Sequence, residues 1–278
     1  MKLGIMQFST DEAMPPGELA AAVEERGFES LFFPEHTHIP TERRSPWPGG
    51  PELPREYLRT NDLFVALAMA AAATTKLKIG TGICLVVEHD PIVLAKQVAT
   101  LDSLSGGRLI FGIGGGWNAE EMENHGTSFR RRWAILRERI EAMRSIWMND
   151  EAAYHGEYVN FDSIWSWPKP VQKPHPPILL GSGSGSGRQR VVDYCDGWMP
   201  IAGRNPIEDG IADLWARADA AGRDRSTISI SVFGAPADAA TLARYEEAGV
   251  ERALLHVPPA GRDVVLPVLD RRAKLLST

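Results

Sequence analysis

A run of alternating glycine and serine, GSGSGSG at residues 181–187, is the strongest chemical signal in the chain. Glycines let a backbone approach a ligand closely. A helix that follows such a run points free N–H groups and its positive dipole end at the bound group, so a phosphate suits the place. The run is not a Walker loop, because no Gly-Lys-Ser/Thr ending follows. A flexible loop without a ligand is the alternative.

A second candidate is the histidine pair His36 and His38 in PEHTHIP (34–40). An imidazole can hydrogen-bond a cofactor ring or move a proton near neutral pH, although a purely structural histidine is equally compatible with this position. Paired histidines also occur in metal sites, and His89 and His256 are conceivable further ligands. The first expected strand ends in Ser9, Thr10 and Asp11, which make poor partners, and we predict no metal.

Glycines 114–116 and three tryptophans complete the candidates. The triple glycine is a second place where backbone could meet a flat ligand, with close strand–helix packing as the alternative. Trp117, Trp165 and Trp167 could wall a pocket for a planar ligand or pack loops onto the rim of the fold.

The segments that carry these residues alternate between strand-like and helix-like patterns along the chain. We expect strands at Leu3–Phe8, Leu31–Phe33, Leu77–Val87, Arg108–Ile113, Ile178–Leu180, Gly197–Ile201, Ile228–Phe233 and Ala253–Val257. We expect helices at 16–26, 63–73, 91–104, 129–147, 207–221, 238–248 and 263–275, with Asp62 and Asp90 as N-caps. A further helix should follow the Gly/Ser run and end near Cys195.

This alternation predicts an α/β fold, a (β/α)8 TIM barrel that forms a single domain over residues 1–278. The Pro-rich stretch 34–54 and the segment 154–177 predict insertions after strand 2 and before strand 5. An open doubly wound sheet is disfavoured because no GxGxxG turn follows the first strand. In such barrels the active site lies at the C-terminal strand ends, where the candidate motifs fall.

The composition of the chain limits the classes of partner and the cellular location that we expect. The formal net charge is −6, which suggests no bulk attraction to nucleic acid or to anionic membranes. The two cysteines, Cys84 and Cys195, fit a reducing cytoplasm. The apolar stretch 63–73 is about half of what a membrane span needs, and the N-terminal apolar run is too short for a signal peptide.

Six stretches in this order resemble the luciferase-like monooxygenase superfamily, and within it the coenzyme F420-dependent subgroup. They are PEHTHIP (34–40), IGTGICLV (79–86), DPIVLAKQVATLDSLSGGR (90–108), GIGGGWNAEEM (112–122), WPKPVQKPHPPILLGSGS (167–184) and DGWMP (196–200). The resemblance covers almost the whole chain and is more specific for the superfamily than for the cofactor or the substrate.

The resemblance implies roles for individual residues. His36 matches a histidine near the cofactor ring and is our catalytic candidate. Gly82-Ile83 matches a non-proline cis peptide that backs the ring, and 181–184 matches a phosphate loop. The implied cofactor-binding set is His36, Thr81, Gly82, Ile83, Gly114, Gly115, Gly116, Asn118, Gly181, Ser182, Gly183 and Ser184. The expected substrate pocket comprises His38, Trp117, Trp165 and Trp167.

The resulting hypothesis is hydride transfer between F420 and a small organic substrate. An FMN-dependent monooxygenase and a non-catalytic flavin or F420 carrier are the alternatives, and a homodimer is left open. The sugar-phosphate dehydrogenases of the family carry a glutamate where this chain has Trp117, which puts their substrate in doubt here. The chain also leaves little room for the long lid of bacterial luciferases, which disfavours light emission.

Overall fold

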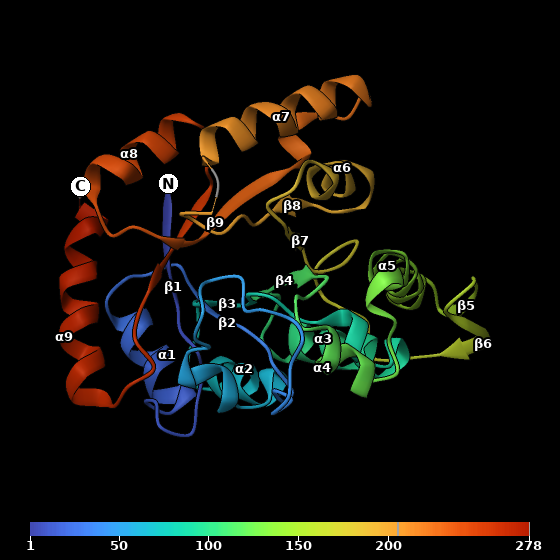
Figure 1. Ribbon diagram of the computed structural model, residues 1–278, viewed down its shortest axis with the longest axis horizontal. Coiled ribbons are helices and arrows are strands. Elements are labelled where there is room, and N and C mark those ends of the chain that lie inside the picture. The colour runs from blue at the N-terminus through green and yellow to red at the C-terminus, as the bar shows by residue number, and fades with distance from the viewer. Residues whose placement is uncertain (205, 278) are drawn as a thin grey trace.

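The structure, a computed structural model, describes residues 1–204 and 206–277. Within them, parallel strands close into a barrel in the order β1-β10-β9-β8-β7-β4-β3-β2 (Figure 1). The strands are β1 (Lys2–Met6), β2 (Ser30–Phe33), β3 (Lys78–Thr81), β4 (Leu109–Gly114), β7 (Ile178–Gly181), β8 (Gly197–Trp198), β9 (Ser229–Ala235) and β10 (Arg252–His256). The predicted TIM barrel is confirmed.

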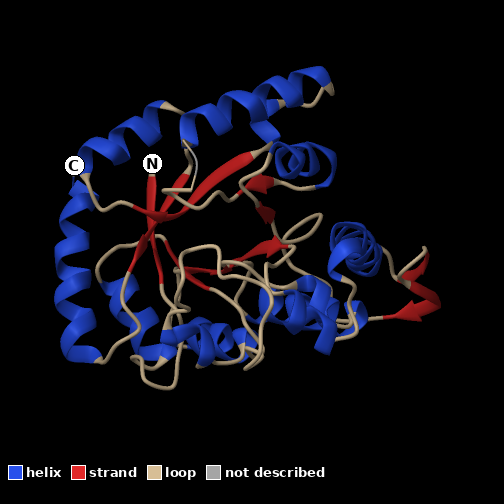
Figure 2. Ribbon diagram, in the orientation of Figure 1, coloured by secondary structure: helices blue, strands red, loops and turns tan. Residues whose placement is uncertain are grey.

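Helices surround the strands on the outside (Figure 2). They are α1 (Pro16–Glu25), α2 (Leu63–Ala72), α3 (Pro91–Leu104), α4 (Ala119–Asn124), α5 (Arg132–Met148), α6 (Gly185–Tyr194), α7 (Ile207–Ala220), α8 (Ala239–Glu247) and α9 (Arg262–Ala273). The two expected caps are present. Asp62 accepts from the Val65 N–H at 2.9 Å, and Asp90 accepts from the Val93 N–H at 2.9 Å.

Both predicted insertions are present. Residues 34–62 lie between β2 and α2 and contain one short 3-10 helix, Arg55–Leu58. Before β7, the antiparallel hairpin of β5 (Glu151–His155) and β6 (Asn160–Trp165) projects from the barrel beside α5, as Figure 1 shows.

The expected strand Leu77–Val87 was wrong in its length. Regular pairing ends at Thr81, and Val86–Glu88 forms a 3-10 turn. Beyond β3 the Cys84 N–H still donates to the Gly112 carbonyl at 2.8 Å, but the Leu85 N–H donates to the buried Glu35 carboxylate instead of to a strand. The expected strand Gly197–Ile201 is likewise cut to β8, because Pro200 has no N–H to donate to a ladder.

The core has two parts. A large cluster fills the space between the strands and the helices. A smaller one fills the inside of the barrel and consists of Met6, Phe8, Phe32, Ile110, Leu179, Met199 and Leu254. Several of these side chains also form the floor of the site described below. In the described part of the chain, no helix is both long and apolar enough to cross a membrane.

Candidate functional site

A cavity of about 610 Å³ opens where the barrel strands end. The strand ends contribute Met6, Gly82, Gly114 and Gly181, and the insertion after β2 contributes Trp47 and Tyr57. Polar groups are few at this mouth. They include His36, Glu35, Ser182, Arg188, Arg204 and His256. A mostly apolar cavity with a few polar groups is the usual form of a small-molecule site.

One wall of the cavity is made of backbone. A Cβ added to Gly114 would lie 2.6 Å from Ile83 Cδ1, and one added to Gly181 would lie 2.9 Å from Ile83 Cγ2. A Cβ on Gly115 would lie 2.9 Å from the Trp133 ring. Side chains at these positions would therefore require their neighbours to shift. The Gly82–Ile83 peptide bond is cis, as the resemblance implied.

Gly116 turns the chain toward the opposite wall. Its φ of +65° lies in the left-handed region that glycine adopts without penalty, and a Cβ there would lie 2.4 Å from Met122 Cε. The next residue, Trp117, contacts His36 edge-on, with ring centroids 5.9 Å apart. The turn after β4 thus brings an aromatic ring next to the imidazole.

Aromatic rings from the insertion after β2 continue this wall. The Tyr57 ring lies 5.1 Å from His36, 4.7 Å from Phe8 and 5.6 Å from Trp47, measured between centroids. Burial raises the pKa of the Tyr57 hydroxyl, so the phenol stays protonated at neutral pH. These rings shelter the imidazole from water.

Glu121 holds His36 from behind. His36 Nδ1 lies 2.8 Å from Glu121 Oε2, and the other oxygen accepts from the Thr37 N–H at 3.1 Å. The Glu121 carboxyl is fully buried. Because a carboxylate only accepts hydrogen bonds, we assign the ring proton of His36 to Nδ1. The lone pair on Nε2 can then accept a hydrogen bond or a proton.

Glu88 adds a buried carboxyl behind Glu121. Burial, followed by the negative charges of Glu121 and Glu35, raises the pKa of Glu88 to about 9. Glu88 is therefore neutral at pH 7. Neither of its oxygens has a hydrogen-bond partner in the described part of the chain. His125 Nε2 is the basic group beside it, at 3.8 Å.

Glu35, Cys84 and His89 have the spacing of metal ligands, with their donor atoms within 4.8 Å of one another. Glu35 Oε1 already bonds His89 Nε2 at 2.9 Å. Burial lowers the pKa of the His89 imidazole, but the Glu35 hydrogen bond and the charges of Glu35 and Asp62 together outweigh burial and raise that pKa. Burial raises the pKa of the Cys84 thiol. These groups form a hydrogen-bonded pair beside a protonated thiol.

The N-terminus of α6 forms the far end of the cavity. Ser184 caps the helix by accepting from the Gly187 N–H at 3.1 Å. The Ser182 carbonyl accepts from Trp198 Nε1 at 2.7 Å, which fixes the start of the loop. Arg188, in the first turn of α6, donates to the Gly183 carbonyl at 3.2 Å. The positive end of a helix dipole and a guanidinium therefore meet here, which suits an anion.

The profile of the luciferase-like monooxygenase family matches residues 10–272. The chain belongs to this family. The family comprises oxidoreductases and monooxygenases, which supports an enzyme that acts on small molecules.

Relatives of this luciferase-like protein differ in cofactor. An uncharacterized protein of Mycobacterium tuberculosis is 40% identical over 286 residues, which cover 100% of this chain and 99% of the relative. The F420-dependent hydroxymycolic acid dehydrogenase of the same organism is 28% identical and covers 88% of this chain and 66% of its own length. An FMNH(2)-dependent dimethylsulfone monooxygenase of Pseudomonas putida is 33% identical but covers 54% of this chain and 42% of its own length.

Solved structures support the fold of this luciferase-like barrel. The monooxygenase RslO1 from Streptomyces bottropensis superimposes with a TM-score of 0.82 at 20% identity, covering 100% of this chain and 99% of that one. An F420-dependent secondary alcohol dehydrogenase gives 0.77 at 19% identity, covering 99% and 98%.

The structure brings most of the sequence-predicted residues to the cavity. They are His36, Gly82, Ile83, Gly114, Gly115, Gly116, Trp117, Gly181, Ser182 and Gly183. Thr81 and Asn118 lie behind this lining, and Ser184 is exposed at the N-cap of α6. Thr81 Oγ1 donates to the Gly112 carbonyl at 2.6 Å, and Asn118 is buried against Glu121.

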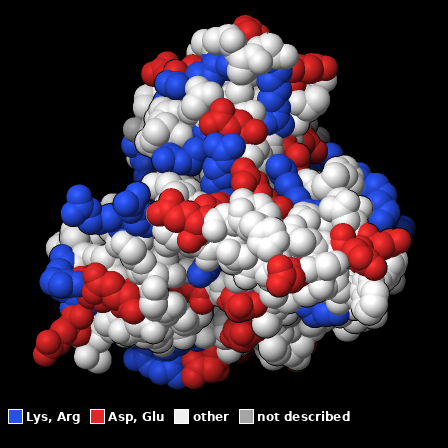
Figure 3. Space-filling view, turned by 90° about the vertical axis from the view of Figure 1, so that its right-hand side faces the viewer, with Lys and Arg blue, Asp and Glu red and all other residues white. Residues whose placement is uncertain are grey.

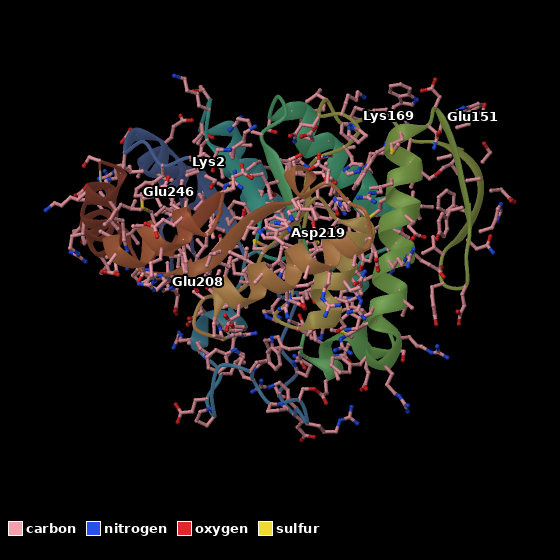
Figure 4. All side chains as sticks on the ribbon, turned by 90° about the horizontal axis from the view of Figure 1, so that it is seen from above. Lys2, Glu151, Lys169, Glu208, Asp219 and Glu246 are labelled. Atoms are coloured by element: carbon pink, nitrogen blue, oxygen red, sulfur yellow. The ribbon has the colours of Figure 1, made fainter. Side chains whose placement is uncertain are left out.

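Three residues expected in the substrate pocket lie elsewhere. His38 faces outward, between Thr37 Oγ1 at 2.9 Å and Asn124 at 2.8 Å. Trp165 is 76% exposed and bonds Glu151, and Trp167 is 57% exposed and packs near Lys169. Figure 4 shows Glu151 and Lys169 on the same side as Lys2, away from the pale blue loop that follows β2. The hairpin carries these tryptophans to the side opposite the cavity mouth.

Sequence reasoning missed several lining residues. Trp47 and Arg204 come from loops, and Tyr57 comes from the short 3-10 helix within the insertion after β2; no periodicity reveals the path of these segments. Glu121 was visible in the motif GIGGGWNAEEM, but its neighbour Glu120 has the same chemistry. Only the fold distinguishes them, since Glu120 pairs with Arg44 near the surface and Glu121 with His36 inside.

Proposed function

We propose that the protein is an F420-dependent oxidoreductase that transfers hydride between the deazaflavin and a small organic substrate. One observation carries the proposal. The cavity combines a side-chain-free backbone wall, a histidine held by a buried carboxylate and an anion-suited helix N-terminus at its far end.

The residues present fit such a cofactor. The glycines at 82, 114, 115 and 181 line the cavity with backbone, where neighbouring side chains leave no room for a Cβ, and such a wall suits a flat ring system. The 181–184 loop and Arg188 would hold the phosphate. When bound, the deazaflavin supplies hydride chemistry, and the protein supplies orientation and surroundings.

His36 and the aromatic wall supply the remaining functions. Glu121 keeps the proton on His36 Nδ1, so Nε2 can accept a hydrogen bond or a proton from a substrate hydroxyl in the cavity. Tyr57, Trp47 and Trp117 cover this position and limit the access of water. Alignment of the reactants in a sheltered space is what direct hydride transfer requires.

The share of this chain that each relative covers supports F420 as the cofactor rather than FMN. The F420-dependent relative aligns with 88% of this chain, whereas the FMNH(2)-dependent relative aligns with 54%. That second relative favours an FMN-dependent monooxygenase as the alternative, because the cavity would hold either ring.

Anaerobic turnover distinguishes the F420-dependent oxidoreductase from the FMN-dependent monooxygenase. Purified protein with oxidised F420 and a panel of alcohols, or with reduced F420 and a panel of ketones and enones, is followed at the F420 absorbance band without oxygen. We expect substrate-dependent absorbance change and no substrate-dependent oxygen uptake in air. Oxygen uptake with reduced FMN and no anaerobic turnover would identify a monooxygenase. F420 binding without turnover under any condition would identify a carrier.

A further inference from the structure

A second cavity lies on the outside of the barrel, between α5, α6 and α7. Its volume is about 510 Å³. Its lining residues, which we call the arginine cleft, are Trp133, Arg137, Ser186, Gln189, Arg190, Asp193, Tyr194 and Arg217. Figure 3 faces this side of the molecule and shows basic side chains gathered at the indentation between its upper and lower parts.

The charge of the arginine cleft is unbalanced. Arg190 stacks on the Trp133 ring at 4.4 Å and has no hydrogen bond or carboxylate partner among residues 1–204 and 206–277. Arg132, outside the lining, lies 5.5 Å from the same ring and donates to the Phe129 carbonyl at 2.8 Å, while its buried Nε has no partner in the described part of the chain. Burial and the positive charge of Arg190 lower the pKa of Arg132, because the two cations repel each other.

The other charged groups do not cancel this excess. Arg217 Nε bonds Asp213 at 2.9 Å, and Arg137 Nε bonds Glu141 at 2.7 Å, so each has one carboxylate. Asp193 is the acidic residue in the lining, and it accepts from Gln189 at 2.9 Å. Within the described residues, Arg190 beside the Trp133 ring is therefore the guanidinium of the lining that remains for an external anion.

The arginine cleft adjoins the anion-suited loop of the main cavity. Trp133 lines both cavities. Ser186 Oγ, in the cleft, lies 3.1 Å from Ser184 Oγ at the cap of α6. Arg188 of the main cavity and Arg217 of the cleft both bond the same Asp213 oxygen. A ligand phosphate at the loop would thus have the cleft as its next neighbour.

We propose that the arginine cleft binds a carboxylate-bearing tail that continues from a phosphate held at the 181–184 loop. This rests on the proposed function and deepens it, because F420 continues beyond its phosphate into a tail with carboxylates, whereas FMN ends at the phosphate. The cleft would then distinguish the two cofactors by their tails, with Arg190 as the main contact and Arg217 beside it.

Matched ligands test this assignment. Wild-type protein is titrated with F420 and with the same deazaflavin ending at its 5′-phosphate, at low and at moderate salt. We expect F420 to bind about tenfold more tightly and the difference to shrink with salt. Arg190→Gln should remove most of the difference and leave the affinity for the truncated deazaflavin unchanged. Arg271→Gln, an exposed arginine on α9, is the control and should change neither value.

The outcomes separate the two proposals. Equal affinity for both ligands in the wild type, or a preference that Arg190→Gln leaves intact, would overturn the tail site while the F420 function stands. Failure of both deazaflavins to bind would remove the function itself. Thermal unfolding of each variant without ligand shows whether Arg190→Gln is folded, and Arg190→Lys, which keeps the charge, should recover part of the preference.

Discussion

In the proposed reaction His36 accepts a proton from the substrate, which requires the same tautomer at every turnover. A single buried carboxylate, that of Glu121, fixes this tautomer. Glu121 reaches both the His36 ring and the Thr37 amide, so it orients the side chain and its backbone together. This arrangement makes Glu121 a positioning residue that acts through His36.

Replacing Glu121 by glutamine should disturb this tautomer. We expect Glu121→Gln to lower kcat/KM on the order of 100-fold, with little change in cofactor affinity. The histidine ¹⁵N spectrum should show a changed proton distribution between the two His36 nitrogens. Glu123→Gln, on the exposed side of the same helix, is the control. Unchanged kinetics and spectrum in Glu121→Gln would contradict the role.

The pKa of Glu88 predicts a pH dependence of stability. This pKa rises from 4.5 to about 9 in the folded protein. Between these values the unfolded chain has released its proton and the folded chain has not, so the free energy of unfolding falls as the pH rises from 4.5 toward 9. Glu88→Gln removes this loss, and we expect it to exceed wild type on the order of 2 kcal/mol at pH 8 and to match it near pH 4.5.

Urea unfolding at both pH values measures this difference. Glu25→Gln, which replaces an exposed glutamate on α1, should follow the wild type throughout. A wild-type difference between the two pH values that survives in Glu88→Gln would assign the titration to another group.

Among single residues, the sequence predicted His36 as a site residue but did not predict the groups that orient it. His36 follows a strand, and a strand end is recognisable from the pattern of apolar residues. Glu121 and Glu88 derive their properties from burial and from neighbours 33 and more residues away in sequence, which local patterns do not encode. The raised pKa of Glu88 arises only when the barrel closes.

Among the elements, the loop between β7 and α6 is where a mutation should affect phosphate binding most. Gly183→Asp adds bulk and negative charge at the cavity end, and we expect it to weaken F420 binding about tenfold or more. Gly261→Asp adds the same group in open space at the N-terminus of α9 and is the matched control. Equal affinities of the two variants in a fluorescence titration would remove the phosphate role from this loop.

The hairpin of β5 and β6 should be independent of the cavity. Trp165→Ala combined with Trp167→Ala should leave the F420 affinity within about twofold of wild type, because both rings lie outside the lining. Trp117→Ala, which opens the aromatic wall beside His36, should weaken binding about tenfold. A loss of F420 affinity in the hairpin variant as large as that in Trp117→Ala would show that the hairpin contributes to the site.

This hairpin also shows why element order was predictable and element placement was not. Alternating segments and turn residues identified the strands of the barrel and both insertions. The direction in which an insertion leaves the barrel depends on packing against α5, so the tryptophans of 165 and 167 could not be assigned to a side. The path of the chain after β3 similarly involves a side chain from another strand end, because the Leu85 N–H donates to Glu35.

For the whole molecule, a barrel with parallel strands gathers the strand ends at one mouth, and this rule located most of the cavity from sequence. It did not locate the arginine cleft, which forms where α5, α6 and α7 meet on the outside. Only the packed molecule brings Arg137 of α5 to the same cleft as Arg190 of α6 and Arg217 of α7.

A parallel titration of the purified protein with F420 and with FMN, read by fluorescence and by thermal shift, tests the central claim most directly. Binding to the folded state raises the melting temperature with ligand concentration, so both readouts report the same event. Our account predicts saturable F420 binding that is clearly tighter than FMN binding. Tight FMN binding with weak or absent F420 binding would contradict it and would favour a flavin monooxygenase on the same barrel.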